Sequence, residues 1–285
     1  MIILLATQQK QAFLIIAYHQ PVLLQQLVSQ IDNINCDIYI HYDNKSVLPE
    51  IVVLHSSLVF TNRIDVKWGK QSLIEAELIL FEAAFQKGPY DFYHLLSGQD
   101  LLLQQISVVL DFFGNHTNTN FVGFGQYDGW YFWDYNKKRA KAQMDSILLK
   151  YGQMKYGSQW CSLTQSAVNI LVTEKLDIQK YFYGLDSADE FYKQTVLLAH
   201  NQSFYDIKNQ FNGNQRHIDW SNGGPNPKTF DKSDLSVLLS IPRMFARKFN
   251  IEHMDVINAI IAKTNQKEIE PQLQQNIQDV RDISA

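Results

Sequence analysis

Three acidic residues stand just ahead of an apolar helical run in the stretch DSADEFYKQTVLLAH, residues 186–200. They are Asp186, Asp189 and Glu190. Acids at such a place interact favourably with the free N–H groups of a helix start, and Ser187 with Glu190 has the spacing of a capping box. A carboxylate can also act as a general base that takes a proton from a hydroxyl. Taken by itself, the stretch favours the capping interpretation.

Two cations lie side by side near the end of the chain. Arg247 and Lys248 occur in FARKF, residues 245–249, between apolar residues. Paired cations can neutralise a diphosphate leaving group as a divalent metal would. Without further context, the pair is more typical of a solvated basic pair at the end of a helix.

Polar residues also follow three apolar segments that are typical of strands. Tyr18 and His19 end the first segment, Asp43 ends the second, and Asp100 follows a third in SGQD. Ligands of open α/β sheets bind beyond the carboxyl ends of the strands, where Gly98 would let a ligand approach the backbone closely. Asp43 could there accept a hydrogen bond from a base or a ribose hydroxyl. The same strings are rich in turn formers, so a plain turn stays open as the alternative.

The elements that must carry these residues alternate between strand and helix. The apolar run 12–18 is typical of a buried parallel strand, Pro21 opens a helix, and residues 36–43 form a second strand. This opening predicts a nucleotide-binding α/β fold. We expect one domain over residues 1–250, with a nucleotide-binding half (about 12–125), an acceptor half (about 126–250) and a helical or flexible tail (251–285).

Later segments follow the same alternation. Ser72 should cap a helix over residues 72–87, with Glu75 three residues on, and Thr164 should cap a helix that follows a strand. The Gly- and Pro-rich segment 214–230 reads as a loop. Further strands are expected near 59–60, within 90–100 and over 120–125, and further helices near 107–116 and 234–241.

Composition excludes several classes of protein. The 285 residues include 25 basic and 29 acidic side chains, a balance that argues against nucleic acid as partner. Cys36 and Cys161 are too few and too far apart for a disulfide framework, which favours a reducing compartment. The N-terminus makes a poor signal peptide, and no apolar run approaches the length of a membrane span. We expect a cytoplasmic protein and leave open a peripheral contact with the inner face of the membrane.

Several catalytic and cofactor motifs are missing from the sequence. It contains no G-x-G-x-x-G, P-loop, H-E-x-x-H, G-x-S-x-G or D-x-D string and no Cys/His cluster. The chain therefore lacks the patterns of classical dinucleotide enzymes, kinases, zinc hydrolases and serine hydrolases. We expect neither a metal nor a cofactor.

Seven strings together resemble a known family. The core-2/I-branching β-1,6-N-acetylglucosaminyltransferases, which include peptide O-xylosyltransferase and many bacterial transferases, are similar over residues 12–250. The strings, in chain order, are IYIHYDNKS, VKWGKQSLIEAELILFEAAF, DFYHLLSGQDLLL, GSQWCSLT, ADEFYKQTVL, WSNGGPNPKTF and FARKF. The resemblance implies a glycosyltransferase-A fold, in which a Rossmann-like mixed sheet flanked by helices binds a UDP-sugar. It also implies an inverting, metal-independent transfer.

The resemblance assigns the catalytic residues. The family's base is the glutamate of a P-D-E motif, which corresponds to Glu190 in A-D-E, where Ala188 replaces the proline. The basic residues that neutralise the diphosphate correspond to Arg247 and Lys248. We expect the helix N-terminus to keep Glu190 ionised while Asp186 and Asp189 seat the helix.

The resemblance also assigns binding residues. The uracil-contacting aspartate corresponds to Asp43, and Asp100 lies near the donor, where we also expect Tyr18 and His19. Trp220, ahead of the Gly/Pro loop, should face the acceptor sugar, and we place Trp160 with it.

The function expected from this resemblance is transfer of GlcNAc from a UDP-sugar to a hydroxyl of a glycan or lipid-linked oligosaccharide, in bacterial surface polysaccharide synthesis. UDP-xylose, UDP-galactose and UDP-glucose remain alternative donors. Two other classes also stay open: a non-catalytic nucleotide- or glycan-binding module, and a glycoside hydrolase, in which the basic pair would have no role.

Overall fold

The described part of the chain, residues 10–126 and 137–265 of a computed structural model, forms a six-stranded mixed sheet of order β3-β2-β1-β4-β7-β6. The first four strands are parallel, and β7 and β6 are antiparallel to their neighbours. The bounds are β1 (Gln11–Ala17), β2 (Cys36–Tyr42), β3 (Ser57–Phe60), β4 (Phe92–Ser97), β6 (Phe121–Phe124) and β7 (Gly157–Thr164). The predicted α/β class with a Rossmann-like mixed sheet is confirmed.

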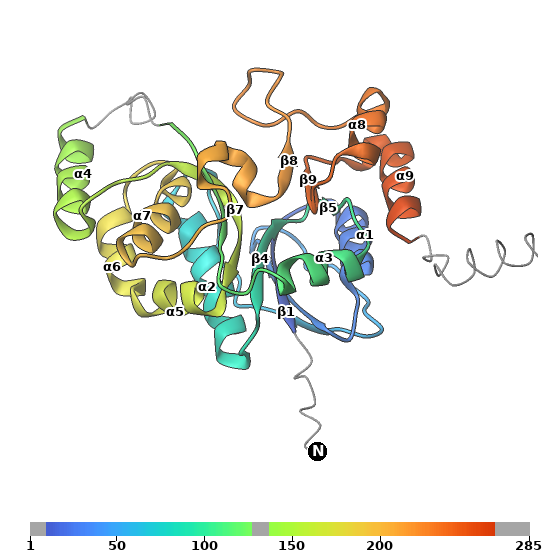
Figure 1. Cartoon of the computed structure of the whole chain (residues 1–285), viewed down its shortest axis with the longest axis horizontal. Helices are drawn as coiled ribbons and strands as arrows, with labels where there is room; N and C mark the ends of the chain where they lie inside the picture. Colours follow the sequence, from blue (N-terminus) through green and yellow to red (C-terminus); the bar gives the residue numbers. More distant parts are fainter. Residues whose placement is uncertain (1–9, 127–136, 266–285) are drawn as a thin grey trace, which may run out of the picture.

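Helices cover both faces of this sheet (Figure 1), which explains why the central strands are continuous apolar runs. Leu27, Phe113 and Ile257 belong to a buried cluster on one face, and Leu78 and Leu171 to a second cluster on the other. The first face carries α1 (Pro21–Ile31), α3 (Ile106–Gly114), α8 (Leu235–Ser240) and α9 (Met254–Thr264). The second face carries α2 (Gln71–Lys87), α4 (Lys137–Tyr151), α5 (Gln165–Thr173), α6 (Lys175–Phe182) and α7 (Tyr192–Ala199).

A second, three-stranded sheet lies beyond the carboxyl ends of β1 and β4 (Figure 1). Its order is β5 (Leu101–Leu102), β9 (Phe245–Arg247) and β8 (Arg216–Ile218). The segment 214–230, predicted as a loop, thus contains a strand, and Arg247 belongs to a strand and not to a helix end. Strands of two or three residues are too short to show a period in the sequence, and only the pairing of distant segments creates them.

Helix starts agree with the sequence only in part. Thr164 is the N-cap of α5, and its Oγ1 accepts a hydrogen bond from the Ala167 N–H at 3.3 Å, as predicted. The prediction for Ser72 is wrong: Lys70 holds the N-cap position of α2, and Ser72 Oγ instead accepts the N–H of Lys67 at 2.8 Å.

The last described helix belongs to the packed structure. Val256, Ile257 and Ile260 of α9 are fully buried, and Gln30 Nε2 donates to Thr264 Oγ1 at 2.9 Å. This helix lies in the segment predicted as a tail, and the division of the chain at residue 250 stays a prediction. Residues 266–285 of that tail and 127–136 of the predicted acceptor half lie outside the described residues. Within the described ranges, no helix combines the length and apolarity that crossing a membrane requires.

Candidate active site

The carboxyl ends of three neighbouring strands meet at one edge of the large sheet. The Asp43 N–H donates to Ala17 O at 2.9 Å, and the Gly98 N–H donates to Ile16 O at 2.9 Å. The segment after β9 joins the same edge, because the Phe249 N–H donates to Gln99 O at 3.0 Å. The residues singled out at strand ends and in FARKF therefore gather around one edge, although they are far apart in the chain.

A buried ion pair joins two of these residues. Arg247 Nε lies 3.2 Å from Asp100 Oδ1, without the alignment of a hydrogen bond. Asp100 is 1% exposed and also accepts hydrogen bonds from the N–H and Oγ of Ser97. Burial raises the pKa of Asp100, and the charge of Arg247 opposes that shift. Arg247 is thereby held at the edge of the sheet.

The Arg247 guanidinium also lies over the ring of Trp160, 4.3 Å from its centroid. This indole is 6% exposed, so the contact that the structure shows for Trp160 is a cation–π contact with Arg247. The predicted contact between Trp160 and an acceptor sugar stays a prediction.

Lys248, Tyr18 and His19 lie close to this pair. Burial and then the charge of Arg247 lower the pKa of Lys248. Burial and then the charge of Lys248 lower the pKa of His19. The ring of Tyr18 stacks on His19 with centroids 3.8 Å apart and is 54% exposed, so it offers an open aromatic surface.

Asp43 is held in the turn that follows β2. Its carboxylate accepts hydrogen bonds from the N–H and Nζ of Lys45, at 2.8 and 2.9 Å, and from the Val66 N–H at 3.2 Å. Burial alone would raise the pKa of Asp43, but these hydrogen bonds bring it below its ordinary value. Asp43 is therefore a fixed, ionised acceptor whose predicted contact with uracil stays a prediction.

Glu190 carries a buried carboxylate oxygen, Oε2, with no hydrogen-bond partner among the described residues. Burial and then the charge of Asp189 raise the pKa of Glu190 to about 8, and Lys193 and Arg247 oppose the shift. The turn that carries Glu190 packs against β7, the strand whose Trp160 contacts the Arg247 guanidinium, so Glu190 and Arg247 belong to one site. The expectation that a helix start keeps Glu190 ionised is wrong.

The local backbone explains this difference. Residues Ala188–Glu190 form a short 3-10 turn, Ser187 has a left-handed φ of 51°, and no side-chain capping bond is made there. Helix α7 begins only at Tyr192. A capping box needs an extended N-cap residue, so the predicted box between Ser187 and Glu190 does not form.

The two remaining acids do not seat the helix. Asp186 is exposed and forms an ion pair with Lys70 at 2.5 Å. Asp189 is 5% exposed, and its Oδ1 has no hydrogen-bond partner in the described part of the chain. Burial and then the charge of Glu77 raise the pKa of Asp189 to about 7.

Two tryptophans near the predicted site elements in sequence have exposed rings. Trp220 is 51% exposed in the loop after β8. Trp68, which the sequence analysis did not single out, is 71% exposed. Its neighbour Gly69 has a φ of +65° and accepts the N–H of Ser187 at 2.8 Å, so the loop of Trp68 is fastened to the turn that carries Glu190.

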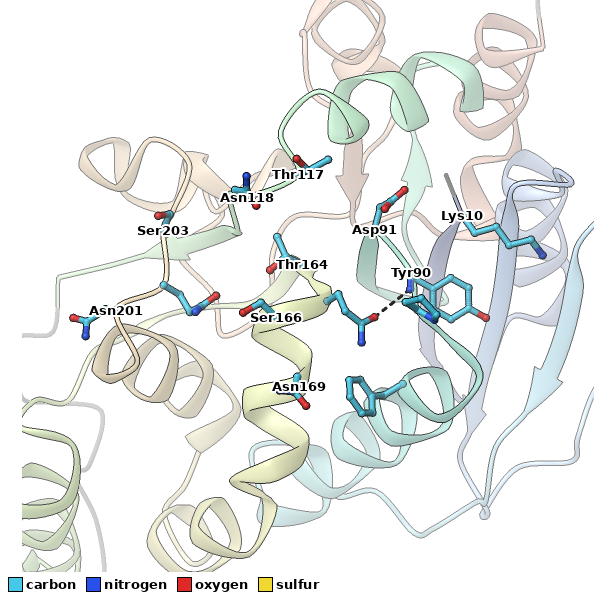
Figure 2. Close-up of a pocket in the computed structure, with 14 residues that line it drawn as sticks. Lys10, Tyr90, Asp91, Thr117, Asn118, Thr164, Ser166, Asn169, Asn201 and Ser203 are labelled. Atoms are coloured by element: carbon cyan, nitrogen blue, oxygen red, sulfur yellow. Dashed lines mark hydrogen bonds between the residues drawn. The ribbon is translucent and has the colours of Figure 1, made fainter. Parts of the chain in front are cut away.

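A separate groove lies at the opposite edge of the sheet, before β4 and around the start of α5 (Figure 2). Its volume is about 960 Å³, and none of the predicted site residues lines it. Neutral amide and hydroxyl side chains such as Asn118, Asn169 and Ser203 predominate there, with Lys10 and Asp91 at one end. The candidate active site is therefore assigned to the edge that holds Glu190 and Arg247.

Known proteins give an independent indication of the family. A family model described as Core-2/I-Branching enzyme matches residues 11–240. The chain belongs to the Core-2/I-Branching enzyme family. No curated protein sequence matches this branching-family chain significantly. Among solved structures, the apo form of mouse xyloside xylosyltransferase 1 is similar with 10% identity and a TM-score of 0.36, over 85% of this chain and 99% of that one.

Three buried charged residues near the site of this branching-family chain, Glu77, Lys193 and Arg216, were not predicted from the sequence. Glu77 and Lys193 form a fully buried ion pair. Arg216 is 3% exposed and donates to Leu95 O at 3.2 Å and to Cys161 O at 2.6 Å. Glu77 and Lys193 occupy positions on otherwise apolar faces of predicted helices. A charged residue at such a position indicates a buried polar group, and this is the sequence signal for the pair.

The described residues show no arrangement of metal ligands. Over residues 10–126 and 137–265, no group of three or more His, Cys, Asp or Glu side chains is arranged to hold a metal ion. Arg247 and Lys248 are cations at the strand edge, and Lys45 is another, bound to Asp43.

Proposed function

We propose that the chain is an inverting glycosyltransferase that works without a metal. It transfers a sugar, most simply GlcNAc, from a UDP-sugar to a hydroxyl of a glycan or lipid-linked oligosaccharide. Family membership supports the reaction class. One observation carries the mechanism: Glu190 has a buried carboxylate oxygen without a partner among the described residues, on a turn that packs against β7, and Trp160 of β7 contacts the Arg247 guanidinium.

In this proposal Glu190 takes the proton of the acceptor hydroxyl while that oxygen attacks the anomeric carbon. The bond from this carbon to the UDP oxygen breaks on the opposite side, so the anomeric centre inverts. A base works best when its pKa lies near the working pH, and the pKa of about 8 for Glu190 suits this role better than that of an ordinary carboxylate.

The departing UDP carries its new charge on the diphosphate. Arg247 and Lys248 neutralise it, in place of a divalent metal. Asp100 and Trp160 hold the Arg247 guanidinium from two sides, at 3.2 and 4.3 Å. We therefore give Asp100 and Trp160 positioning roles, in addition to the donor and acceptor contacts expected from the sequence.

The remaining assignments follow the resemblance. Tyr18, His19 and Asp43 contact the nucleotide, and Trp220 contacts the acceptor sugar through its exposed ring. A glycosyltransferase-A fold, a bacterial source, surface polysaccharide as the product and peripheral binding at the inner face of the membrane complete the proposal.

The test separates binding from transfer. A thermal-shift panel of UDP-GlcNAc, UDP-xylose, UDP-galactose and UDP-glucose in EDTA should identify one stabilising donor, and transfer to oligosaccharide acceptors should persist in EDTA. Glu190→Gln should lower the transfer rate by about 100- to 10,000-fold, because general-base catalysis contributes this much, and should leave UDP binding intact.

The matched control is Asp186→Asn, which changes an exposed acid on the same loop. This variant should transfer sugar at the wild-type rate. Full turnover by Glu190→Gln would contradict the assignment of the base. Binding of UDP without transfer to any acceptor would favour the non-catalytic module, and release of free sugar without a nucleotide would favour the hydrolase.

A further inference from the structure

A buried polar network lies directly behind the turn that carries Glu190. Its centre is the ion pair between Glu77 of α2 and Lys193 of α7, in which both side chains are 0% exposed. Lys193 Nζ contacts Glu77 Oε2 and also donates to the backbone carbonyl of Asp189 at 3.0 Å. That carbonyl belongs to the peptide group whose nitrogen is the backbone nitrogen of Glu190.

The network leaves the pair little freedom. Glu77 also accepts hydrogen bonds from Gln159 Nε2 at 3.0 Å and from the Tyr192 hydroxyl. The Lys193 ammonium lies 4.2 Å from the centroid of the Tyr192 ring. Since Gln159 is on β7, the network ties α2, α7 and the sheet together behind Glu190.

Stability alone does not explain a pair at this depth. Removing two charges from water costs free energy that their attraction often fails to offset, and well-packed apolar residues in the same place are commonly as stable. The position of the cation suggests a different role. Lys193 donates a hydrogen bond to the Asp189 carbonyl, next to Glu190, and its charge opposes the rise in the pKa of both Asp189 and Glu190.

We propose that Lys193 is a positioning residue for Glu190: its ammonium fixes the Asp189 carbonyl, and with it the direction of the Glu190 carboxylate, and faces that carboxylate with a positive charge from the protein interior. Glu77 holds Lys193 in place. This inference rests on the proposed function, since it concerns the residue proposed as the base.

The charges around Glu190 come from two sides. Asp189, its neighbour in the turn, raises the pKa of Glu190, while Lys193 of α7 and Arg247 of β9 lower it. Burial and then the charge of Glu77 raise the pKa of Asp189, and the charge of Lys193 lowers it. When a diphosphate occupies Arg247, the positive field of that guanidinium is largely cancelled. Lys193 then remains as the cation that favours the ionised, proton-accepting form of Glu190.

The test is the double variant Glu77→Gln with Lys193→Met. Lys193→Met alone would leave the Glu77 charge buried without a counterion, and such a variant can fail to fold. The double variant removes both charges. The side-chain amide introduced at position 77 can still form hydrogen bonds with Gln159 and Tyr192, and the methionine fills the volume of the lysine side chain. The matched control is Glu82→Gln with Lys175→Met, an ion pair at 2.6 Å that joins α2 to α6 and is part-exposed.

Two quantities are measured: the pKa of Glu190, from the pH titration of its carboxyl ¹³C signal assigned with Glu190→Gln, and kcat for transfer against pH. In the double variant we expect the pKa of Glu190 to rise by about one unit and kcat at pH 7 to fall about 10-fold, with an unchanged Kd for UDP. The control should match the wild type in both quantities.

A folded double variant with wild-type values of both quantities overturns the proposal. The two hypotheses fail in different ways. If the wild type transfers no sugar but the pKa of Glu190 still rises in the double variant, the proposed function is wrong while the role of Lys193 stands.

Discussion

At the scale of single residues, the site is defined by two adjacent acids, each with one carboxyl oxygen that is buried without a hydrogen-bond partner in the described part of the chain. The pKa of Glu190 is raised to about 8 and that of Asp189 to about 7, chiefly by burial. At the pH where the base must be ionised, burying these carboxylates lowers the stability of the folded state. Active sites commonly give up stability in this way for the sake of catalysis.

Replacing Glu190 by Gln should therefore stabilise the fold at high pH. The carboxyl group has an ordinary pKa of 4.5 when unfolded and about 8 when folded, so the folded state binds more protons between these values. Stability falls as the pH rises through this window. At pH 8.5 we expect the free energy of unfolding of the variant to exceed that of the wild type by about 4–5 kcal/mol, since each unit of difference between the two pKa values is worth about 1.4 kcal/mol, and at pH 4 the two should agree.

Urea unfolding at both pH values measures this difference, with Asp186→Asn as the control. An identical pH dependence in the wild type and in Glu190→Gln would show that Glu190 titrates like an exposed acid. That result would remove the electrostatic support for its role as a base.

At the scale of elements, local sequence predicts a helix better than it predicts the residue that caps it. Thr164 ends a buried strand and caps α5, and its Oγ1 also donates to Asn120 Oδ1 at 3.1 Å. Ser72 has the same local signal but lies inside α2, because the chain already enters the helix at Lys70. Whether the hydroxyl residue becomes the N-cap therefore depends on the residue at which the preceding segment of the chain enters the helix.

The two hydroxyls should therefore differ in their effect on stability. Thr164→Val removes the cap and leaves the Asn120 amide oxygen with one partner fewer, so it should lower the free energy of unfolding by about 1–2 kcal/mol. Ser72→Ala removes an acceptor for the exposed N–H of Lys67 and should cost less than about 0.5 kcal/mol. Chemical denaturation of both variants measures the difference, and equal losses would contradict the assigned caps.

At the scale of the whole molecule, the sheet separates two apolar clusters, and α9 closes one of them. Ile257 of α9 is fully buried in the same cluster as Leu27 of α1 and Phe245 of β9. Helix α9 packs against β5, the strand that pairs with β9, which carries Arg247. Stability and the candidate active site are linked through this cluster.

Ile257→Ala should lower the free energy of unfolding by about 2–4 kcal/mol, the range for truncating a fully buried isoleucine. Unfolding should remain a single transition by circular dichroism and fluorescence. The control is Leu239→Ala on α8, where the side chain is 43% exposed and the loss should stay below about 1 kcal/mol. A wild-type stability for Ile257→Ala would support the predicted division of the chain at residue 250.

The sequence by itself determined the order and type of the long elements, because apolar runs and helical periods are local properties. The run 12–18 and the Pro21 start predicted β1 and α1 nearly to the residue. The seven family strings also predicted the correct family, because a family resemblance depends on the residues and their order along the chain and not on how the chain folds.

Only the tertiary structure decided how these residues act on one another. It paired Arg247 with Asp100 and Trp160, it formed β8 and β9 from segments without a period, and it placed Lys193 behind Glu190. It also reversed the expectation for the charge of Glu190. The physical reason is that burial and the distances between charges depend on segments brought together from far along the chain, and these quantities set a pKa more strongly than sequence neighbours do.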